Sequence, residues 1–190
     1  MSTLAAQRFT IATVLTLALA ALSGTVEGQT PDKQAAQEKW KAFYAQVVRL
    51  QKDAAAAFNR EMDRDKADPC RQAVSTRDSE ECLGKENNAA AANYKAYFEA
   101  LHALLALTPG GGENRTTGPT GVSLTSKEVV EEFDGAEAAW QKYRQTQCMA
   151  AFDLYKGGTA AVPQASFCDL MLVRSHMREL ERIYSVRLHN

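Results

Sequence analysis

Two cysteines placed symmetrically about a pair of glycines constrain the fold of this chain more than any other feature of its sequence. Cys148 lies ten residues before Gly158, and Cys168 lies ten residues after it. Because glycine commonly ends a helix, Gly157-Gly158 predicts a turn between two helices. In an antiparallel pair of helices that turns there, the two sulfur atoms lie at the same height. The pattern therefore predicts a helical hairpin that is stapled by a disulfide.

The chain has four cysteines with none left over, which is typical of two disulfides in an oxidising compartment. Three pairings of the four are possible in principle. The spacings between successive cysteines are 12, 66 and 20 residues. They lack the close pairs that are typical of a zinc site. We therefore expect neither a metal site nor a cofactor.

Residues 1–28 have the pattern of a secretory signal peptide. Arg8 precedes an apolar run over residues 11–22, and small residues follow that run. The run is too short to span a bilayer, which needs about 20 residues. We expect cleavage after Ser23 or near Gly28. The mature protein is then periplasmic or secreted, and it has no transmembrane helix.

A long amphipathic helix is predicted from Asp32 to about Lys66, within an N-terminal region of residues 29–68. Asp68-Pro69 ends it, because proline disfavours helical geometry in the residue before it. The apolar stripe of this helix must pack on the rest of the chain or on a partner. The stripe comprises Trp40, Phe43, Tyr44, Val47, Leu50, Ala54, Phe58 and Met62.

Three more helices are predicted in a second region, residues 69–190. Ser75 or Thr76 caps the first of them, and residues 125–128 form a capping box that opens the next. Pro163 fits the first turn of the last helix. The glycines and prolines of residues 109–121 predict a flexible loop. The expected fold is all-α, a small disulfide-stapled bundle of about four helices behind a signal peptide.

Apolar spacing also predicts which faces of the last two helices are buried. On the third helix these side chains are Val129, Phe133, Ala136, Trp140, Tyr143 and Gln147. On the fourth helix they are Phe167, Met171, Met177, Leu180 and Tyr184.

An acidic cluster at the start of the third helix is one candidate binding site. It includes Glu131, Glu132 and Asp134, and it could attract a basic partner protein. Acids also suit the N-terminus of a helix. In an antiparallel hairpin, a residue before Gly158 lies beside the residue about equally far after it. This reflection about the glycine turn places Asp134 opposite Arg182 and Glu137 near Arg178. We prefer these structural interpretations.

A second set of candidates comprises Trp140, Tyr143, Arg144 and Arg174. Arg174 shares one helical face with two further arginines at four-residue steps, and such a stripe can hold phosphate or carboxylate groups. It can equally pair with the third helix. Reflection places Arg144 near Leu172 and Arg174, where it braces the hairpin or binds a carboxylate. Bracing is the preferred interpretation for both arginines.

Neither catalysis nor nucleic-acid binding is expected. His102, His176 and His189 stand in no nucleophile or metal-binding motif, so we do not expect an enzyme. The formal net charge is −1, and no basic tail stands out. A chain with that charge pattern has little attraction for nucleic acid.

The order of these motifs resembles the LprI-like lysozyme-inhibitor N-terminal domain. The resemblance covers about residues 70–184. It lies in Ala139-Trp140-x-x-Tyr143-Arg144-x-x-x-Cys148, then Gly157-Gly158-Thr159, then Cys168-x-x-x-Leu172-x-Arg174, with Cys70 and Cys82 before them.

This resemblance implies a small exported helical domain in a bacterial cell envelope. It also implies two disulfides, Cys70–Cys82 and Cys148–Cys168, and it implies lysozyme as the partner that the protein binds and inhibits. The alternative is a non-catalytic periplasmic interaction module that binds another envelope protein.

Overall fold

The computed structural model of the protein describes residues 31–108, 115–117 and 123–189. The signal-peptide prediction for residues 1–28 lies outside these ranges. Within them the expected all-α bundle is confirmed. The helices are α1 (Pro31–Ala67), α2 (Thr76–Ala106), α3 (Ser126–Leu154), α4 (Ala161–Ile183) and the short α5 (Ser185–His189).

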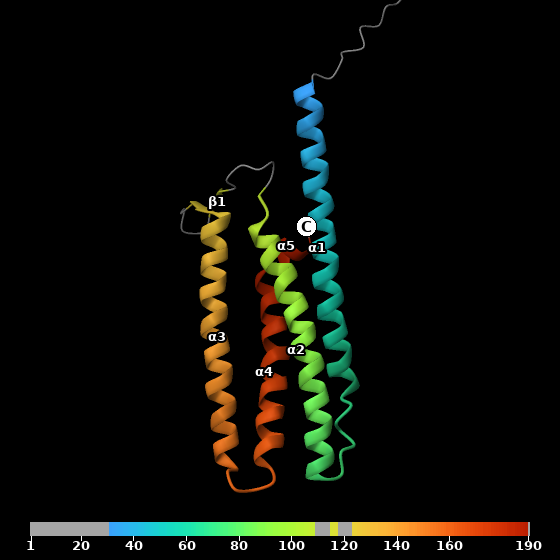
Figure 1. Cartoon of the computed structure of the whole chain (residues 1–190), viewed down its shortest axis with the longest axis vertical. Coiled ribbons are helices and arrows are strands. Elements are labelled where there is room, and N and C mark those ends of the chain that lie inside the picture. The colour runs from blue at the N-terminus through green and yellow to red at the C-terminus, as the bar shows by residue number, and fades with distance from the viewer. Residues whose placement is uncertain (1–30, 109–114, 118–122, 190) are drawn as a thin grey trace, which may run out of the picture.

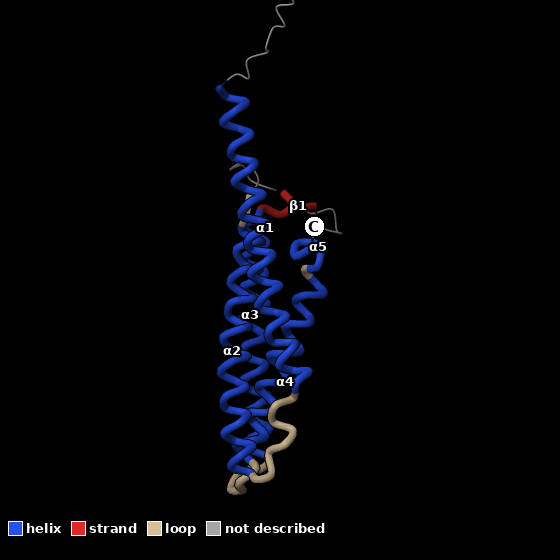
Figure 2. The backbone as a smooth tube through the Cα atoms, turned by 90° about the vertical axis from the view of Figure 1, so that its right-hand side faces the viewer, coloured by secondary structure: helices blue, strands red, loops and turns tan. Residues whose placement is uncertain are grey.

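The four long helices run side by side in alternating directions, which makes an elongated bundle (Figure 1). The α1–α2 connection (residues 68–75) and the α3–α4 connection (residues 155–160) therefore lie at the same end. At the other end, α1 extends beyond its neighbours in both views (Figures 1 and 2). We call the end with the two connections the braced end, and the end where α1 extends the open end.

Both predicted disulfides form, and both lie at the braced end. Cys70–Cys82 joins the α1–α2 connection to α2, with a Cα–Cα distance of 5.7 Å. Cys148–Cys168 joins α3 to α4, with a Cα–Cα distance of 5.4 Å. Each closes a short loop, and in the chain-entropy model each stabilises the fold by roughly 3 kcal/mol. The hairpin predicted about Gly158 is confirmed.

Local signals in the sequence set most helix boundaries. Ser75 caps α2 by accepting a hydrogen bond from the backbone N–H of Asp78. Thr125 and Glu128 form the complete capping box that opens α3. Pro163 lies in the first turn of α4, as expected. After α1 ends, Asp68 adopts a left-handed conformation with φ of 42°, as is common just beyond a helix end.

The predicted flexible loop over residues 109–121 contains a short strand. In this part of the chain, β1 (Arg115–Thr117) pairs antiparallel with β2 (Ser123–Thr125), which leads directly into α3. Residues 115–117 are the part of the predicted loop that the structure describes, and they form β1. Residues 109–114 and 118–122 lie outside the described ranges.

The core lies around α2, which packs against α1, α3 and α4. Alanines on α1 allow α2 to approach closely, since Ala54 and Ala57 are completely buried. Tyr97, Leu101 and Met177 are the largest apolar side chains in this fully buried layer. The apolar stripe of α1 packs on the core from Val47 to Met62, and the start of the helix extends past its neighbours. Because that segment lies at the open end, Trp40 and Tyr44 are exposed.

The buried face of α3 is rotated relative to the prediction. Phe133 is buried as expected, but Ala136, Tyr143 and Gln147 are exposed, and Glu137 is buried in their place. The prediction assumed that charged residues face water. Glu137 faces inward because neighbouring helices supply its hydrogen bonds, as described below.

The face predicted for α4 is correct only in part. Met177 and Leu180 are buried, whereas Phe167 and Met171 are exposed near the braced end. Arg174 and His176 are buried instead. Two polar residues therefore take positions that an apolar pattern assigns to hydrophobic side chains.

Candidate functional site

Several large apolar residues at the braced end are exposed to solvent. Val74 in the α1–α2 connection is 93% exposed, and Leu154 beside the α3–α4 connection is 77% exposed. Tyr155 and Phe167 also present much of their surface to solvent. Scattered exposed apolar residues are normal on a soluble protein, but a group at one end is a candidate contact surface.

Two hollows adjoin this surface. The larger, of about 470 Å³, lies between the α1–α2 connection and α4, and Pro69, Cys70, Phe167 and Arg174 are among its lining residues. The smaller, of about 420 Å³, lies beside Cys148–Cys168 and is lined in part by Met149 and Phe152.

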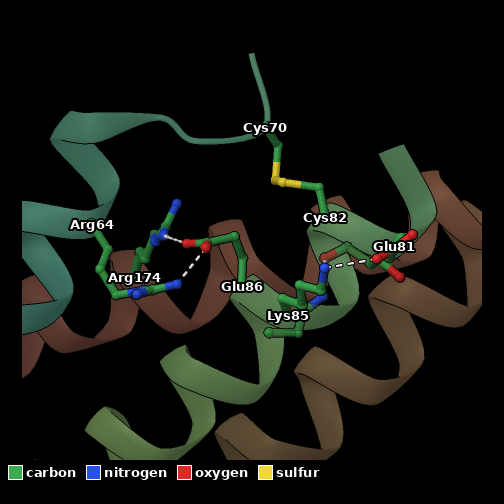
Figure 3. Close-up of a disulfide and its surroundings, with 9 residues drawn as sticks. Arg64, Cys70, Glu81, Cys82, Lys85, Glu86 and Arg174 are labelled. Atoms are coloured by element: carbon green, nitrogen blue, oxygen red, sulfur yellow. Dashed lines mark hydrogen bonds and ion pairs between the residues drawn. A yellow bond between two sulfur atoms is a disulfide. The ribbon is translucent and has the colours of Figure 1, made fainter. Parts of the chain in front are cut away.

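Arg174 lies at the centre of a buried ionic cluster below the first hollow. Its guanidinium donates to Glu61 at 2.7 Å, to Asp65 at 3.1 Å and to Glu86 at 3.3 Å. In Figure 3 the carboxylate of Glu86 points toward both Arg174 and Arg64, and Arg64 also donates to it. Glu61 is completely buried and Glu86 is 4% exposed.

This cluster ties α4 to α1 and α2. Buried charges are tolerated only when they are paired and hydrogen-bonded. The guanidinium of Arg174 donates hydrogen bonds to three carboxylates, so it holds α4 against α1 and α2. Its partners lie on α1 and α2, and the predicted alternative that it pairs with the third helix was wrong. The neighbouring Arg178 likewise pairs with Asp65.

A second buried cluster joins α2, α3 and α4 around Glu137. The Tyr94 hydroxyl donates to Glu137, Gln141 donates to it at 2.9 Å, and His176 Nε2 lies 3.0 Å from its second oxygen. The ring of Trp140 stacks on His176 with centroids 3.9 Å apart and planes 11° from parallel.

The environment of this cluster shifts the pKa of two of its groups. Burial opposes ionisation of Glu137, but hydrogen bonds from His176 and Tyr94 outweigh it, so the carboxyl pKa lies below its usual value. Burial raises the pKa of Tyr94, and the hydrogen bond to Glu137 raises it further. Tyr94, Glu137 and His176 are each less than a tenth exposed. The arrangement stabilises an ionised carboxylate inside the bundle and does not present it to a substrate.

Arg144 braces the hairpin one turn from the second disulfide. Its Nε lies 3.1 Å from Asp169 on α4, and its guanidinium lies 5.3 Å from the centroid of the Trp140 ring. The predicted neighbours were Leu172 and Arg174. Trp140, Arg144 and Arg174 thus contact other helices of the bundle.

The predicted acidic cluster is on the surface of α3. Asp134 pairs with His102 on α2 at 3.3 Å, and Glu131 pairs with Lys127 at 3.6 Å on the same helix. Glu132 is exposed, and its charge contributes to the raised pKa of Tyr184, whose first cause is burial. Tyr143 is 53% exposed on the same helix.

The ion pairs expected from reflection about the turn do not form. Asp134 pairs with His102 and not with Arg182, while Glu137 contacts His176 and not Arg178. Reflection gives the height of a residue along the hairpin, but it does not give the direction of its side chain. Arg174 and Arg178 of α4 pair with residues of α1 and α2 and not with α3.

Glu61, Glu86 and His176 were not predicted as site residues, whereas Glu137 belongs to the predicted acidic cluster of the third helix. One signal in the sequence marks Glu61, because it continues the three- and four-residue steps of Ala54, Ala57 and Phe58. A charge within an apolar stripe indicates a buried pair.

Residues 31–108, 115–117 and 123–189 contain neither a metal-binding cluster nor a membrane-spanning helix. No group of three or more His, Cys, Asp or Glu side chains in these ranges is arranged to hold a metal ion. None of the helices described is both long enough and apolar enough to cross a membrane.

One known protein family matches the part of the chain that holds both disulfides. The family described as lysozyme inhibitor LprI matches residues 67–180, which is more than half of the chain. The chain belongs to the LprI family. The matched region contains both disulfides, both connections of the braced end and all but three residues of α4. No curated protein and no solved structure matches the chain significantly.

The LprI match excludes nearly all of α1. The match begins at the last residue of α1, so the rest of this helix lies outside it. The resemblance inferred from the cysteine pairs, the Trp140 segment and the glycines is thereby confirmed. The description of the LprI family is that of a lysozyme inhibitor.

Proposed function

We propose that this protein is an exported inhibitor that binds lysozyme and slows its hydrolysis of cell-wall glycan. The observation that carries the proposal is the LprI match over residues 67–180, which includes both disulfides. Disulfides persist in oxidising compartments, so they support a periplasmic or secreted location. The apolar segment at residues 11–22 supports export.

A lysis assay tests the inhibition directly. Purified residues 29–190 are mixed with lysozyme, and the turbidity of a suspension of bacterial cell walls is followed. We expect slower clearing at a several-fold molar excess of the protein over lysozyme. Unchanged clearing with a folded, fully oxidised sample would contradict the proposal.

The inhibition is expected to be stoichiometric binding and not enzymatic inactivation. The LprI family is one of inhibitors, and the buried carboxylate cluster around Glu137 is closed to substrates. Prolonged preincubation should therefore leave the extent of inhibition unchanged at a fixed ratio of the two proteins. Inhibition that grows with preincubation time would indicate chemical modification of lysozyme.

A second candidate function is that of a non-catalytic interaction module of the cell envelope. It is favoured by the open end of α1, where Trp40 is 43% exposed, Tyr44 is 59% exposed and Val48 is 62% exposed. These residues lie outside the LprI match. A photo-crosslinker at position 44 tests this function in intact cells. A protein captured there, and not from the exposed position 142 on α3, would favour the module.

A further inference from the structure

The hairpin tip, residues 154–159, contains the end of α3 and most of the turn to α4 at the braced end. It begins with Leu154 and Tyr155, continues through Lys156 and turns at Gly157-Gly158. Figure 1 shows this turn projecting at the bottom of the bundle, at the opposite end from the start of α1.

The backbone of the tip is narrow and ordered. Gly157 has a φ of 87°, a conformation that L side chains rarely adopt, so glycine is needed there for the turn itself. Gly158 donates to the carbonyl of Tyr155 at 2.9 Å, and Lys156 donates to the carbonyl of Asp153 at 3.2 Å. Two adjacent residues without side chains keep the turn slim.

The tip is also held from behind. Cys148–Cys168 joins the two helices that carry it, and Arg144 pairs with Asp169 near the same level. An element that is rigid before binding loses less conformational entropy when it binds. The tip therefore has the pre-organisation expected of an inhibitory segment.

The side chains of the tip are available to a partner. Tyr155 is 42% exposed, and the side chain of Lys156 is 74% exposed. Lys156 lies 3.8 Å from Asp153 in an exposed pair three residues apart. Such pairs contribute little, so the ammonium group can exchange this carboxylate for another at small cost.

We infer that the hairpin tip enters the substrate cleft of lysozyme, with Lys156 facing the catalytic carboxylates and Tyr155 occupying the position of a sugar ring. This inference rests on the proposed function. Glycosidases hold a pair of acidic residues on either side of the scissile bond. A narrow tip with one exposed cation and one exposed aromatic ring complements such a cleft. With a net charge of −1 for the whole chain, the attraction arises from this local arrangement.

The chain supplies a matched control for Lys156. Lys66 lies near the braced end at the end of α1, its side chain is 80% exposed, and it pairs with Asp63 three residues earlier at 3.9 Å. Lys66→Glu and Lys156→Glu therefore make the same charge change in the same local geometry. Tyr143→Ser, on the exposed face of α3, is the corresponding control for Tyr155→Ser.

Inhibition constants for lysozyme are measured for the oxidised wild-type protein and the four variants, after thermal unfolding shows that each is folded. Lys156→Glu should weaken inhibition about tenfold or more, as charge reversal at an interface centre does, and Lys66→Glu should change it less than about twofold. Tyr155→Ser should weaken inhibition more than Tyr143→Ser. A chitooligosaccharide that fills the cleft should compete with the wild-type protein for lysozyme.

The outcomes separate the inference from the proposed function. If the wild-type protein inhibits lysozyme but Lys156→Glu behaves like Lys66→Glu and the oligosaccharide does not compete, the tip is not the inhibitory element, while the proposed function stands. If the wild-type protein neither binds nor inhibits lysozyme, the proposed function itself is wrong.

Discussion

At the braced end two disulfides hold two short connections, whereas at the open end α1 extends past its neighbours with Trp40 and Tyr44 exposed. The LprI match includes the braced end and excludes nearly all of α1. The two ends therefore differ in covalent restraint, in packing and in their relation to the family. We propose that the hairpin tip, residues 154–159, and the helical extension of α1 serve separate purposes.

The interior of the bundle also differs between its two ends. Arg174 and its three carboxylate partners connect α1, α2 and α4 in the half of the bundle nearer the disulfides. At the open end, the first turns of α1 are exposed to solvent. Stability should consequently be concentrated toward the braced end, and the substitutions below test this expectation.

Arg174→Ala should have the largest effect on stability. It leaves the buried Glu61 and Glu86 without their shared partner, and breaking a buried pair in this way costs about 3–5 kcal/mol. Urea unfolding followed by circular dichroism measures the loss. Arg178→Ala, which removes a partly exposed pair with Asp65, should cost no more than about 1 kcal/mol. Equal losses would mean that burial of the cluster does not determine its strength.

Removal of Cys148–Cys168 by paired serine substitutions should lower the free energy of unfolding by roughly 3 kcal/mol, and removal of Cys70–Cys82 should lower it by a similar amount. Lysozyme inhibition should respond differently. Loss of Cys148–Cys168 frees the hairpin tip and should weaken inhibition more than loss of the other bridge. Equal inhibition by the two folded variants would contradict the special role of the tip.

Glu137→Gln should lower the free energy of unfolding by about 1–2 kcal/mol at neutral pH. It replaces one of the two buried carboxylate oxygens, which contact Tyr94 and His176 respectively, with an amide nitrogen that cannot accept a hydrogen bond. The folded pKa of Glu137 lies below its unfolded value. Its ionisation therefore stabilises the fold above the unfolded pKa of about 4.3, and this contribution is lost as the pH falls through the folded pKa.

Urea unfolding of Glu137→Gln and the wild-type protein between neutral and acidic pH measures that contribution. The difference between them should shrink as the pH falls. Glu179→Gln is the control, because its carboxylate also lies near His176, at 3.2 Å, but is half exposed. A difference that stays constant across the acidic range would show that Glu137 is not stabilised as an anion.

Trp40→Ala should have the smallest effect. Although Trp40 is a large aromatic residue, it lies at the open end and is 43% exposed, so its loss should change the free energy of unfolding by less than about 0.5 kcal/mol. Thermal or urea unfolding measures this change. A loss comparable with that of a core aromatic residue would show that the extension of α1 is part of the folded core.

Local signals in the sequence predicted the helices well. The Ser75 cap, the capping box at Thr125 and the turn at Gly157-Gly158 each act within a few residues, and each appears as expected. The hairpin geometry and the resemblance to the LprI family together led to the correct disulfides.

Long-range features were harder to predict for two physical reasons. Apolar periodicity assigns charged residues to the surface, so it missed Glu137 and Glu86, which are buried because other helices pair with them. Periodicity also does not show where a neighbouring helix ends. The stripe on α1 continues to Trp40, but α2 is shorter than α1 and does not cover it.

Amide hydrogen exchange of the oxidised protein, with and without lysozyme, tests most directly whether the braced end is the functional end. We expect lysozyme to slow exchange in residues 154–162 and to leave residues 31–48 unchanged, while a basic protein of similar size without a substrate cleft protects neither segment. Protection of residues 31–48 alone, or no protection by lysozyme at any position, would contradict the account.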